Sequence, residues 1–202
     1  MEPFRSLTAV AAPLDMVNVN TDQIIPARFL RKPRSAGYGN FLFNDIRQDA
    51  GGRQDPNFVL NRPAYAAARI LVAGLNFGCG SSREGAVYAL HDKGFRAVVA
   101  PSFGDIFFNN CAKNGVVAAV LPEPAVAGLL AQLAAQPGAT VTVDLEHDVV
   151  IAPDGARHGF SLDPARKHCL LEGLDDIELT RRHDAAFAAF EQQRHAKLPW
   201  LA

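Results

Sequence analysis

Cysteine is scarce in this chain, and its spacing excludes two kinds of site. The 202 residues include only three cysteines, Cys79, Cys111 and Cys169, which are odd in number and far apart. Such a set does not suit a disulfide framework, and it lacks the C-x-x-C spacing of a zinc or iron–sulfur site. The histidines also lack the H-E-x-x-H spacing of a zinc protease. We therefore expect no metal bound by this chain alone, and a reducing compartment, the cytoplasm.

Long apolar runs and an excess of charge are also missing. The longest apolar runs, such as Gly115 to Leu121, are far shorter than a membrane span. The N-terminus, Met1 to Arg5, has no cationic stretch followed by an apolar core, so we expect no secretory signal. The net charge of −1 indicates no nucleic-acid partner. With 49% hydrophobic and 20% charged residues, the composition is typical of one globular domain with an appendage.

The middle of the chain has the pattern of regular α/β structure. Apolar runs at 69–75, 96–100 and 116–121 predict buried strands, and helices are predicted between them at 84–91 and 101–114. This β-α-β-α-β order indicates parallel strands with right-handed crossovers, and thus an α/β fold. Further elements are expected before and after it: strands at 7–12, 140–145, 149–152 and 157–161, and helices at 123–136, 163–173 and 175–197.

Three other regions carry less regular patterns. The polar run Asn18 to Gln23 is predicted to be a loop, because its side chains can replace backbone partners. Residues 31–62 are rich in Gly, Pro, Asn, Asp and Arg, which indicates an ordered but irregular connection or a mobile flap. The last helix carries apolar residues at Leu179, Phe187 and Phe190. We expect them mainly to cover the protein's own core, with a share facing a partner subunit.

The most informative segment is the glycine-rich loop from Gly74 to Glu84, between a buried strand and a helix. Its glycines let the backbone approach a ligand, and the N–H groups that open the helix favour a negative charge beyond Ser81 and Ser82. Arg83 adds a guanidinium suited to a carboxylate. A purely structural interpretation stays open, since Ser81 lies three residues before a glutamate, as in a capping box. Nucleotide binding is disfavoured, because no lysine follows Gly80.

The same loop carries a resemblance to a known family. Gly78 to Glu84 resembles the signature of the swivelling domain of the aconitase superfamily, and Asn76-Phe77 before it resembles the small subunits of isopropylmalate dehydratases in particular. Further segments resemble the family in order along the chain: Asn20 to Pro26, Leu42 to Asp45, Pro56 to Asn61, Ala100 to Phe107, and Arg166 to Asp175. The chain departs from the family at Gly85, Val87 and Tyr88, where His, Pro and Trp are usual.

The resemblance implies a fold and an assembly. The fold would be a single swivelling β/β/α domain of the aconitase type over residues 1–202, with a parallel-strand β-α-β-α-β core. It would include a flap at about 31–62 and a C-terminal helical extension at about 175–202. The active enzyme would be a heterodimer or heterotetramer in which a large subunit holds a [4Fe–4S] cluster and this chain holds none.

The resemblance also implies a reaction and roles for individual residues. The family interconverts 2-isopropylmalate and 3-isopropylmalate by dehydration and rehydration, in leucine biosynthesis. The implied roles are base for Ser81, acting as an alkoxide, orientation of active-site groups for Asp22, carboxylate binding for Ser82 and Arg83, substrate contacts for Leu30 and Arg31, and backbone support for Gly78 and Gly80.

Two alternatives stay open because of the departures at Gly85, Val87 and Tyr88. One is a paralogous small subunit of a hydratase for another small 2-hydroxy diacid, such as a methylmalate or dimethylmalate. The other is a non-catalytic binding module that keeps the fold.

Overall fold

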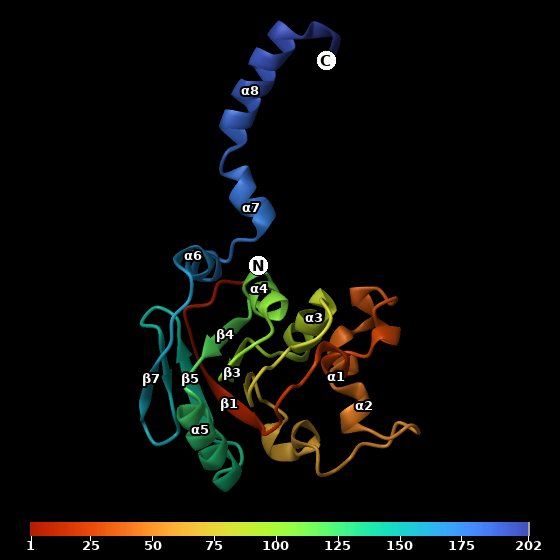
Figure 1. Ribbon diagram of the computed structural model, residues 1–202, viewed down its shortest axis with the longest axis vertical. Coiled ribbons are helices and arrows are strands. Elements are labelled where there is room, and N and C mark those ends of the chain that lie inside the picture. The colour runs from red at the N-terminus through yellow and green to blue at the C-terminus, as the bar shows by residue number, and fades with distance from the viewer. Residues whose placement is uncertain (202) are drawn as a thin grey trace.

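The computed structural model describes residues 1–201, which form a seven-stranded mixed sheet, helices on both of its faces, and a projecting helical arm (Figure 1). The strands are β1 (Ser6–Leu14), β2 (Ile70–Ala73), β3 (Ala97–Ala100), β4 (Val117–Val120), β5 (Thr140–Asp144), β6 (Val149–Ile151) and β7 (Arg157–Gly159). Their order across the sheet is β4-β3-β2-β1-β5-β6-β7. Ala202, the last residue of the predicted extension, lies outside the described residues.

Strand β1 joins two halves of the sheet that differ in direction. On one side it pairs with β2 in parallel, and β2, β3 and β4 continue in parallel. On the other side it pairs antiparallel with β5, which is followed by antiparallel β6 and β7. The predicted three-strand parallel core is confirmed, and β1 adds a fourth parallel strand to it.

Each face of the parallel strands packs against its own set of helices. Leu71 and Ala73 of β2 belong to one apolar core, and Ile70 and Val72 belong to the other, because successive side chains of a strand point to opposite faces. The first core is covered by α1 (Thr21–Ile24), α2 (Asn44–Arg47), α3 (Glu84–Lys93) and α4 (Asp105–Lys113), and the second by α5 (Glu123–Ala135) and α6 (Pro164–Glu172). Burial on both sides explains why these strands read as continuous apolar runs.

Beside the glycine-rich loop, two predicted elements differ from the structure. Residues 18–23 were expected to form a loop, but they include helix α1, which begins with a capping box in which Asn20 Oδ1 accepts from the N–H of Gln23 at 2.8 Å. The helix expected from Pro101 begins only at Asp105. The residues before it are extended, because Phe77 donates its N–H to Ser102 at 3.0 Å and accepts one from Gly104 at 2.9 Å.

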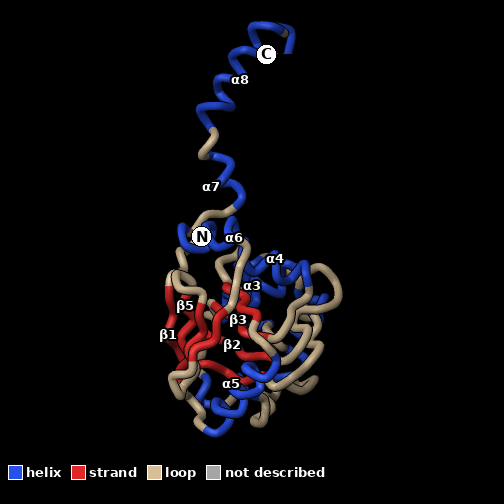
Figure 2. Tube along the Cα trace, turned by 60° about the vertical axis from the view of Figure 1, so that its left-hand side comes forward, coloured by secondary structure: helices blue, strands red, loops and turns tan. Residues whose placement is uncertain are grey.

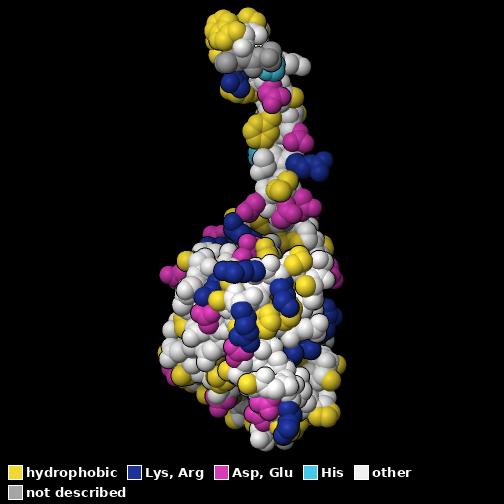
Figure 3. Space-filling view, turned by 90° about the vertical axis from the view of Figure 1, so that its right-hand side faces the viewer, with side chains coloured by type: hydrophobic (Ala, Val, Ile, Leu, Met, Phe, Trp, Pro, Cys, Tyr) yellow, Lys and Arg dark blue, Asp and Glu magenta, His cyan; other side chains and the backbone are white. Residues whose placement is uncertain are grey.

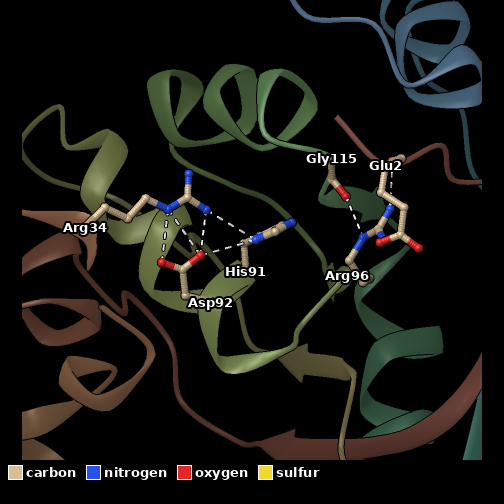
Figure 4. A network of polar contacts seen from close by, with 6 residues as sticks. All are labelled: Glu2, Arg34, His91, Asp92, Arg96 and Gly115. Carbon is tan, nitrogen blue, oxygen red and sulfur yellow. Dashed lines mark hydrogen bonds and ion pairs between the residues drawn. The ribbon is translucent and has the colours of Figure 1, made fainter. Parts of the chain in front are cut away.

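Residues 31–62 form an irregular segment of short helices that packs on α3. It contains η2 (Arg34–Ala36), η3 (Tyr38–Phe41), α2, and η4 (Val59–Asn61); η1 (Ala27–Phe29) precedes it and η5 (Pro63–Tyr65) follows it. Figure 4 shows Arg34 reaching Asp92 near the end of α3, with Nη2 to Oδ1 at 2.6 Å and Nε to Oδ2 at 3.0 Å. The backbone of Gly39 lies so close to Asp92 that an added Cβ would be 2.6 Å from its carbonyl oxygen. The first half of this segment is therefore fixed on α3.

The N-terminus is anchored by a buried arginine. Arg96, 6% exposed, donates from Nε to the carbonyl of Gly115 at 3.0 Å and from Nη2 to that of Glu2 at 3.0 Å, and it forms an ion pair with the Glu2 carboxylate (Figure 4). The N-terminal amine donates to the carbonyl of Gly173 at 2.8 Å. These contacts hold the residues that lead into β1 against the residues that precede β3 and β4.

The C-terminal helix expected at 175–197 is two helices, and the second leaves the body of the protein. α7 (Asp176–Arg181) and α8 (Asp184–Lys197) are separated at Arg182 and His183, and η6 (Pro199–Leu201) follows. Figures 1 and 2 show α8 extending away from the sheet. Leu179 of α7 is half-buried, but Phe187 and Phe190 of α8 are 49% and 64% exposed. The expectation that α8 covers the protein's own core is therefore wrong.

Candidate active site

The glycine-rich loop after β2 is held between two other segments by backbone hydrogen bonds. On one side Gly78 donates to the carbonyl of Val19 at 2.7 Å, and Cys79 accepts from the N–H of Thr21 at 2.9 Å. On the other side the loop pairs with the extended residues before α4, through Phe77. The loop therefore behaves like a short inner strand at the end of the sheet, and the segment containing α1 is fixed beside it.

Gly78 and Gly80 are required for different reasons. Gly78 has φ +72°, and a Cβ there would lie 2.2 Å from the ring of Phe107. Gly80 has φ +90° but has room around it, since its nearest neighbour, Asn20 Cβ, would be 3.5 Å from an added Cβ. Both residues shape the loop backbone, Gly78 through packing and conformation together and Gly80 through conformation alone.

The two serine hydroxyls lie at the exposed edge of this loop. Helix α3 begins at Glu84 with Arg83 as its N-cap residue, and no side chain caps it. The capping-box interpretation of Ser81 is therefore wrong. Ser81 and Ser82 are both exposed, and Ser81 is fixed through its backbone, because its carbonyl accepts from Oγ1 of Thr21 at 2.8 Å. The side chains thus stand at the N-terminus of α3 without serving as its cap.

Arg83 and Asp22 form an ion pair beside the serines. The Arg83 side chain is only 16% exposed, whereas Asp22 on α1 is 55% exposed. Nη1 of Arg83 is buried, and the Asp22 carboxylate is the charge that it faces. The Arg83 guanidinium holds the pKa of Asp22 below its usual range, against the opposing effect of partial burial, and the N–H of Ala27 contributes a smaller lowering. Asp22 is therefore ionised at neutral pH and pairs with the Arg83 guanidinium.

Leu30 and Arg31, the two predicted substrate contacts, differ in their relation to the loop. Leu30 follows η1, is 36% exposed, and lies against Gly85 in the first turn of α3. Arg31 is exposed, and no hydrogen bond or ion pair among the described residues joins it to the loop. The structure thus brings Ser81, Ser82, Arg83, Asp22 and Leu30 into one region and leaves Arg31 at its margin.

The surface around this region carries several cations. Figure 3 shows Lys and Arg side chains among hydrophobic ones on the face formed by α1 to α3 and the irregular segment. Arg28, Arg31, Lys32 and Arg34 are exposed there. One hollow of about 470 Å³ on this face is lined by Arg28 and α2, and another of about 530 Å³, lined by α4, α6 and α7, lies away from it; neither is lined by the two serines. Two of these cations are paired, Arg28 with Asp45 and Arg34 with Asp92. The serine-bearing edge is therefore an open surface of mixed charge, on which a second surface would be needed to enclose a small ligand.

One residue of this region was missed by the sequence interpretation. Thr21 is 2% exposed, and its hydroxyl positions the carbonyl of Ser81. A signal was present, since Asn20 and Gln23 have the three-residue spacing of a capping box. Reading that spacing as a helix start would have placed Thr21 and Asp22 in the first turn of a helix.

The cysteines are spread over the molecule. Cys79 lies in the loop, Cys111 is fully buried in α4, where burial raises the pKa of its thiol, and Cys169 is half-buried in α6. No group of three or more His, Cys, Asp or Glu side chains among the described residues could hold a metal ion. The side chains of residues 1–201 therefore do not fit an iron–sulfur cluster.

Within residues 1–201, no helix is long and apolar enough to cross a membrane.

Comparison with known proteins gives consistent results over the whole length. The family model described as the aconitase C-terminal domain matches residues 1–124, and a model described as LeuD_N matches residues 127–164. The chain is 54% identical over 201 residues to the 3-isopropylmalate dehydratase small subunit of Paramagnetospirillum magneticum, with all of both chains covered. It is 51% identical to the small subunit of the same name from Methylibium petroleiphilum, covering 100% of this chain and 98% of that one.

A solved structure confirms the predicted fold class. The crystal structure of a 3-isopropylmalate dehydratase from Methanocaldococcus jannaschii matches with a TM-score of 0.66 at 24% identity, covering 91% of this chain and 98% of that one. That likeness establishes the fold, and the identity to the full-length relatives establishes the family. The chain therefore belongs to the family of 3-isopropylmalate dehydratase small subunits, within the aconitase superfamily.

Proposed function

We propose that this chain is the small subunit of an enzyme that interconverts 2-isopropylmalate and 3-isopropylmalate by removing and re-adding water, in leucine biosynthesis. Its full-length relatives carry the name of that enzyme's small subunit. The observation that carries the proposal is the pair of exposed serines at the N-terminus of α3, beside a largely buried Arg83 held by Asp22. Such an edge suits an organic diacid, because both the helix terminus and the guanidinium favour a carboxylate.

Each residue of the edge has a role in this proposal. Arg83 and Ser82 hold a substrate carboxylate, and Asp22 orients Arg83. Ser81 takes the proton from the carbon next to a carboxylate, and it must act as an alkoxide to do so. A serine hydroxyl is a weak acid, so its anion needs the backbone N–H groups of the loop and the field of the helix terminus and Arg83. Gly78 and Gly80 give the loop the backbone conformation that presents these groups.

Leu30 and Arg31 are proposed to contact the rest of the substrate. Leu30 supplies an apolar side chain next to the first turn of α3. Arg31 adds a positive charge on the same face. An alkyl-substituted diacid needs both kinds of contact, one for each part of the molecule.

The cluster and the partner belong to the proposal as well. We place a [4Fe–4S] cluster on a large subunit; when bound, it supplies the Lewis acid for the departing hydroxyl. The dispersed cysteines and the open serine edge of this chain support that division of labour. We propose that residues 1–202 form a single swivelling domain with a flap at 31–62 and an extension at 175–202. The free state of all three cysteines suits the cytoplasm.

The extension offers the large subunit a docking surface. Every residue of α8 is exposed. Its aromatic side chains Phe187 and Phe190, with Trp200 of η6 at 74% exposure, are of the kind that anchors protein interfaces. Ending the chain at Arg182 should weaken binding of the large subunit by at least about 30-fold, since buried aromatic anchors contribute about 2 kcal/mol each. The thermal midpoint of the isolated small subunit should change little, because α8 lies away from the sheet. Calorimetric titration of the two subunits measures the affinity.

A matched pair of variants in the full-length chain separates the aromatic contacts from the helix as a whole. Phe187→Ala with Phe190→Ala should reproduce most of the loss. Gln192→Ala should not, because at about 100° per residue it lies on the opposite side of α8. If the truncated chain, the double variant and Gln192→Ala all bind the large subunit as tightly as the unaltered chain does, then α8 is not part of the interface.

The function itself is tested by reconstitution. The chain is mixed with a cluster-loaded large subunit and 3-isopropylmalate, and the absorbance of the unsaturated diacid intermediate is followed. We expect turnover only when both chains are present; no turnover at any subunit ratio would contradict the proposal. Methylmalate and dimethylmalate in the same assay test the second candidate, which Gly85, Val87 and Tyr88 favour.

A further inference from the structure

Thr21, the first residue of α1, binds the glycine-rich loop through two of its polar groups. Its N–H donates to the carbonyl of Cys79 at 2.9 Å, and its hydroxyl donates to the carbonyl of Ser81 at 2.8 Å. The threonine is only 2% exposed, so little water can reach these two bonds. A single buried residue therefore fixes the carbonyls of the residues before and after Gly80.

The turn at Gly80 makes this double contact possible. Its φ of +90° is a conformation that glycine adopts without strain. An added Cβ at Gly80 would lie 3.8 Å from Oγ1 of Thr21, so the threonine hydroxyl lies directly beside the turn. The two carbonyls on either side of the turn can thus face the same residue of α1.

The N–H groups of the same two peptide units must point the other way. The C=O and N–H groups of a planar trans peptide point in opposite directions, and no peptide bond within residues 1–201 is cis. Because the two carbonyls face Thr21, the N–H groups of Gly80 and Ser82 face away from it. Neither N–H donates to another group of residues 1–201, and the exposed Ser81 lies between them in the chain. Two such donors on one side of a turn form the kind of concavity that binds an anion.

We propose that Thr21 is a positioning residue for the base: by holding both carbonyls, it aims the N–H groups of Gly80 and Ser82 at the oxygen of Ser81, where they stabilise its anion. The inference rests on the proposed function, because it concerns the base of that site. Thr21 is buried behind the loop and acts only through it. Without the threonine hydroxyl the peptide between Ser81 and Ser82 can rotate, so that its N–H turns away and a smaller fraction of Ser81 is ionised at a given pH.

The test removes the hydroxyl of Thr21 and keeps the shape of the side chain. In the reconstituted enzyme, Thr21→Val should lower kcat at neutral pH by about 10-fold, which is less than the roughly 10²–10³-fold cost of losing an oxyanion donor outright. The profile of kcat against pH should move to higher pH by about one unit, because one unit offsets an ionised fraction that is about 10-fold smaller. KM should change by less than about 2-fold, since the group held by Thr21 acts in the transition state.

Two further variants show whether the hydroxyl itself is responsible. Thr21→Ser keeps the donor and should restore both kcat and the pH profile. Thr142→Val removes a hydroxyl that is bonded to that of Thr8 at 2.7 Å in the antiparallel half of the sheet. It is the control and should change neither quantity.

The outcomes separate this inference from the proposed function. The role of Thr21 is overturned if folded Thr21→Val keeps the kcat of the unaltered enzyme, if kcat falls without a shift in the pH profile, or if Thr21→Ser shows the same loss. Circular dichroism checks folding: if Thr21→Val does not fold, Thr21→Ala is judged by the same results, and failure of both to fold would also overturn the role. In each of these cases the unaltered complex still converts isopropylmalate, whereas absence of that turnover would overturn both proposals.

Discussion

Replacing Ser81 by alanine should lower the kcat of the assembled enzyme by about 10³-fold, within the range of about 10²–10⁴ that a positioned acid or base contributes. The variant loses the hydroxyl that is proposed to take the proton, but keeps the backbone carbonyl that Thr21 holds. It should therefore fold normally and bind the diacid. Steady-state kinetics of the reconstituted complex measure kcat, and thermal unfolding should show a change within about 0.5 kcal/mol, as for other surface substitutions.

Ser82→Ala is the matched control for that variant. Ser82 is the neighbouring exposed serine and is assigned to carboxylate binding, so its loss should raise KM more than it lowers kcat. If Ser81→Ala retains the turnover of the unaltered enzyme, then Ser81 is not the base, and the non-catalytic binding module becomes the better account of this chain.

Replacing Arg83 by glutamine should raise KM for the diacid by about 100-fold, or about 2.8 kcal/mol at about 1.4 kcal/mol per factor of ten. Glutamine keeps much of the length but cannot offer the charged fork that binds a carboxylate. The loss is large because Arg83 is only 16% exposed, so little water screens its charge. Initial rates over a range of substrate concentrations measure it.

Asp22→Asn tests whether Asp22 acts only by orienting Arg83. This variant keeps the guanidinium and removes the charge that it faces, so its effect on KM should be much smaller than that of Arg83→Gln. The pKa of Asp22 is lowered, so the ion pair is complete above the usual aspartate pKa of about 3.9, and it is lost only as the pH falls through the lower value in the folded protein. The difference in KM between the unaltered enzyme and the Asp22→Asn variant should accordingly be constant across neutral pH. A KM unchanged in Arg83→Gln would contradict the assignment of both residues.

The parallel core and the glycine-rich loop could be predicted from sequence, because both depend on local pattern. Runs such as Ile70–Ala73 are apolar at every position, as is typical of a parallel strand that is covered on both faces. The loop between this strand and α3 lies beyond the carboxyl end of a parallel strand, which is where ligands bind in open α/β sheets. Ser81, Ser82 and Arg83 could therefore be chosen as candidates without coordinates.

The features that sequence did not reveal depend on contacts between distant segments. Nothing local shows that Leu30 packs on Gly85, or that Ser102 and Gly104 continue an inner strand pairing with Phe77. Helix α1 is an exception, because it is local: its four residues are too few for apolar periodicity to reveal, and only the capping-box spacing of Asn20 and Gln23 indicates it. The exposure of Phe187 and Phe190 could not be predicted either, because a helix face that packs on a partner subunit carries the same apolar residues as one that packs on the protein's own core.

The central place of β1 has a consequence for synthesis on the ribosome. This strand is made first, yet one of its two edges finds its partner, β5, only when Thr140–Asp144 has emerged. At about 5–20 residues per second, roughly ten seconds pass during which that edge offers its N–H and C=O groups to any other chain nearby. The nascent protein is therefore most vulnerable to aggregation before its antiparallel half exists, and a chaperone that shields the first strand would act within that interval.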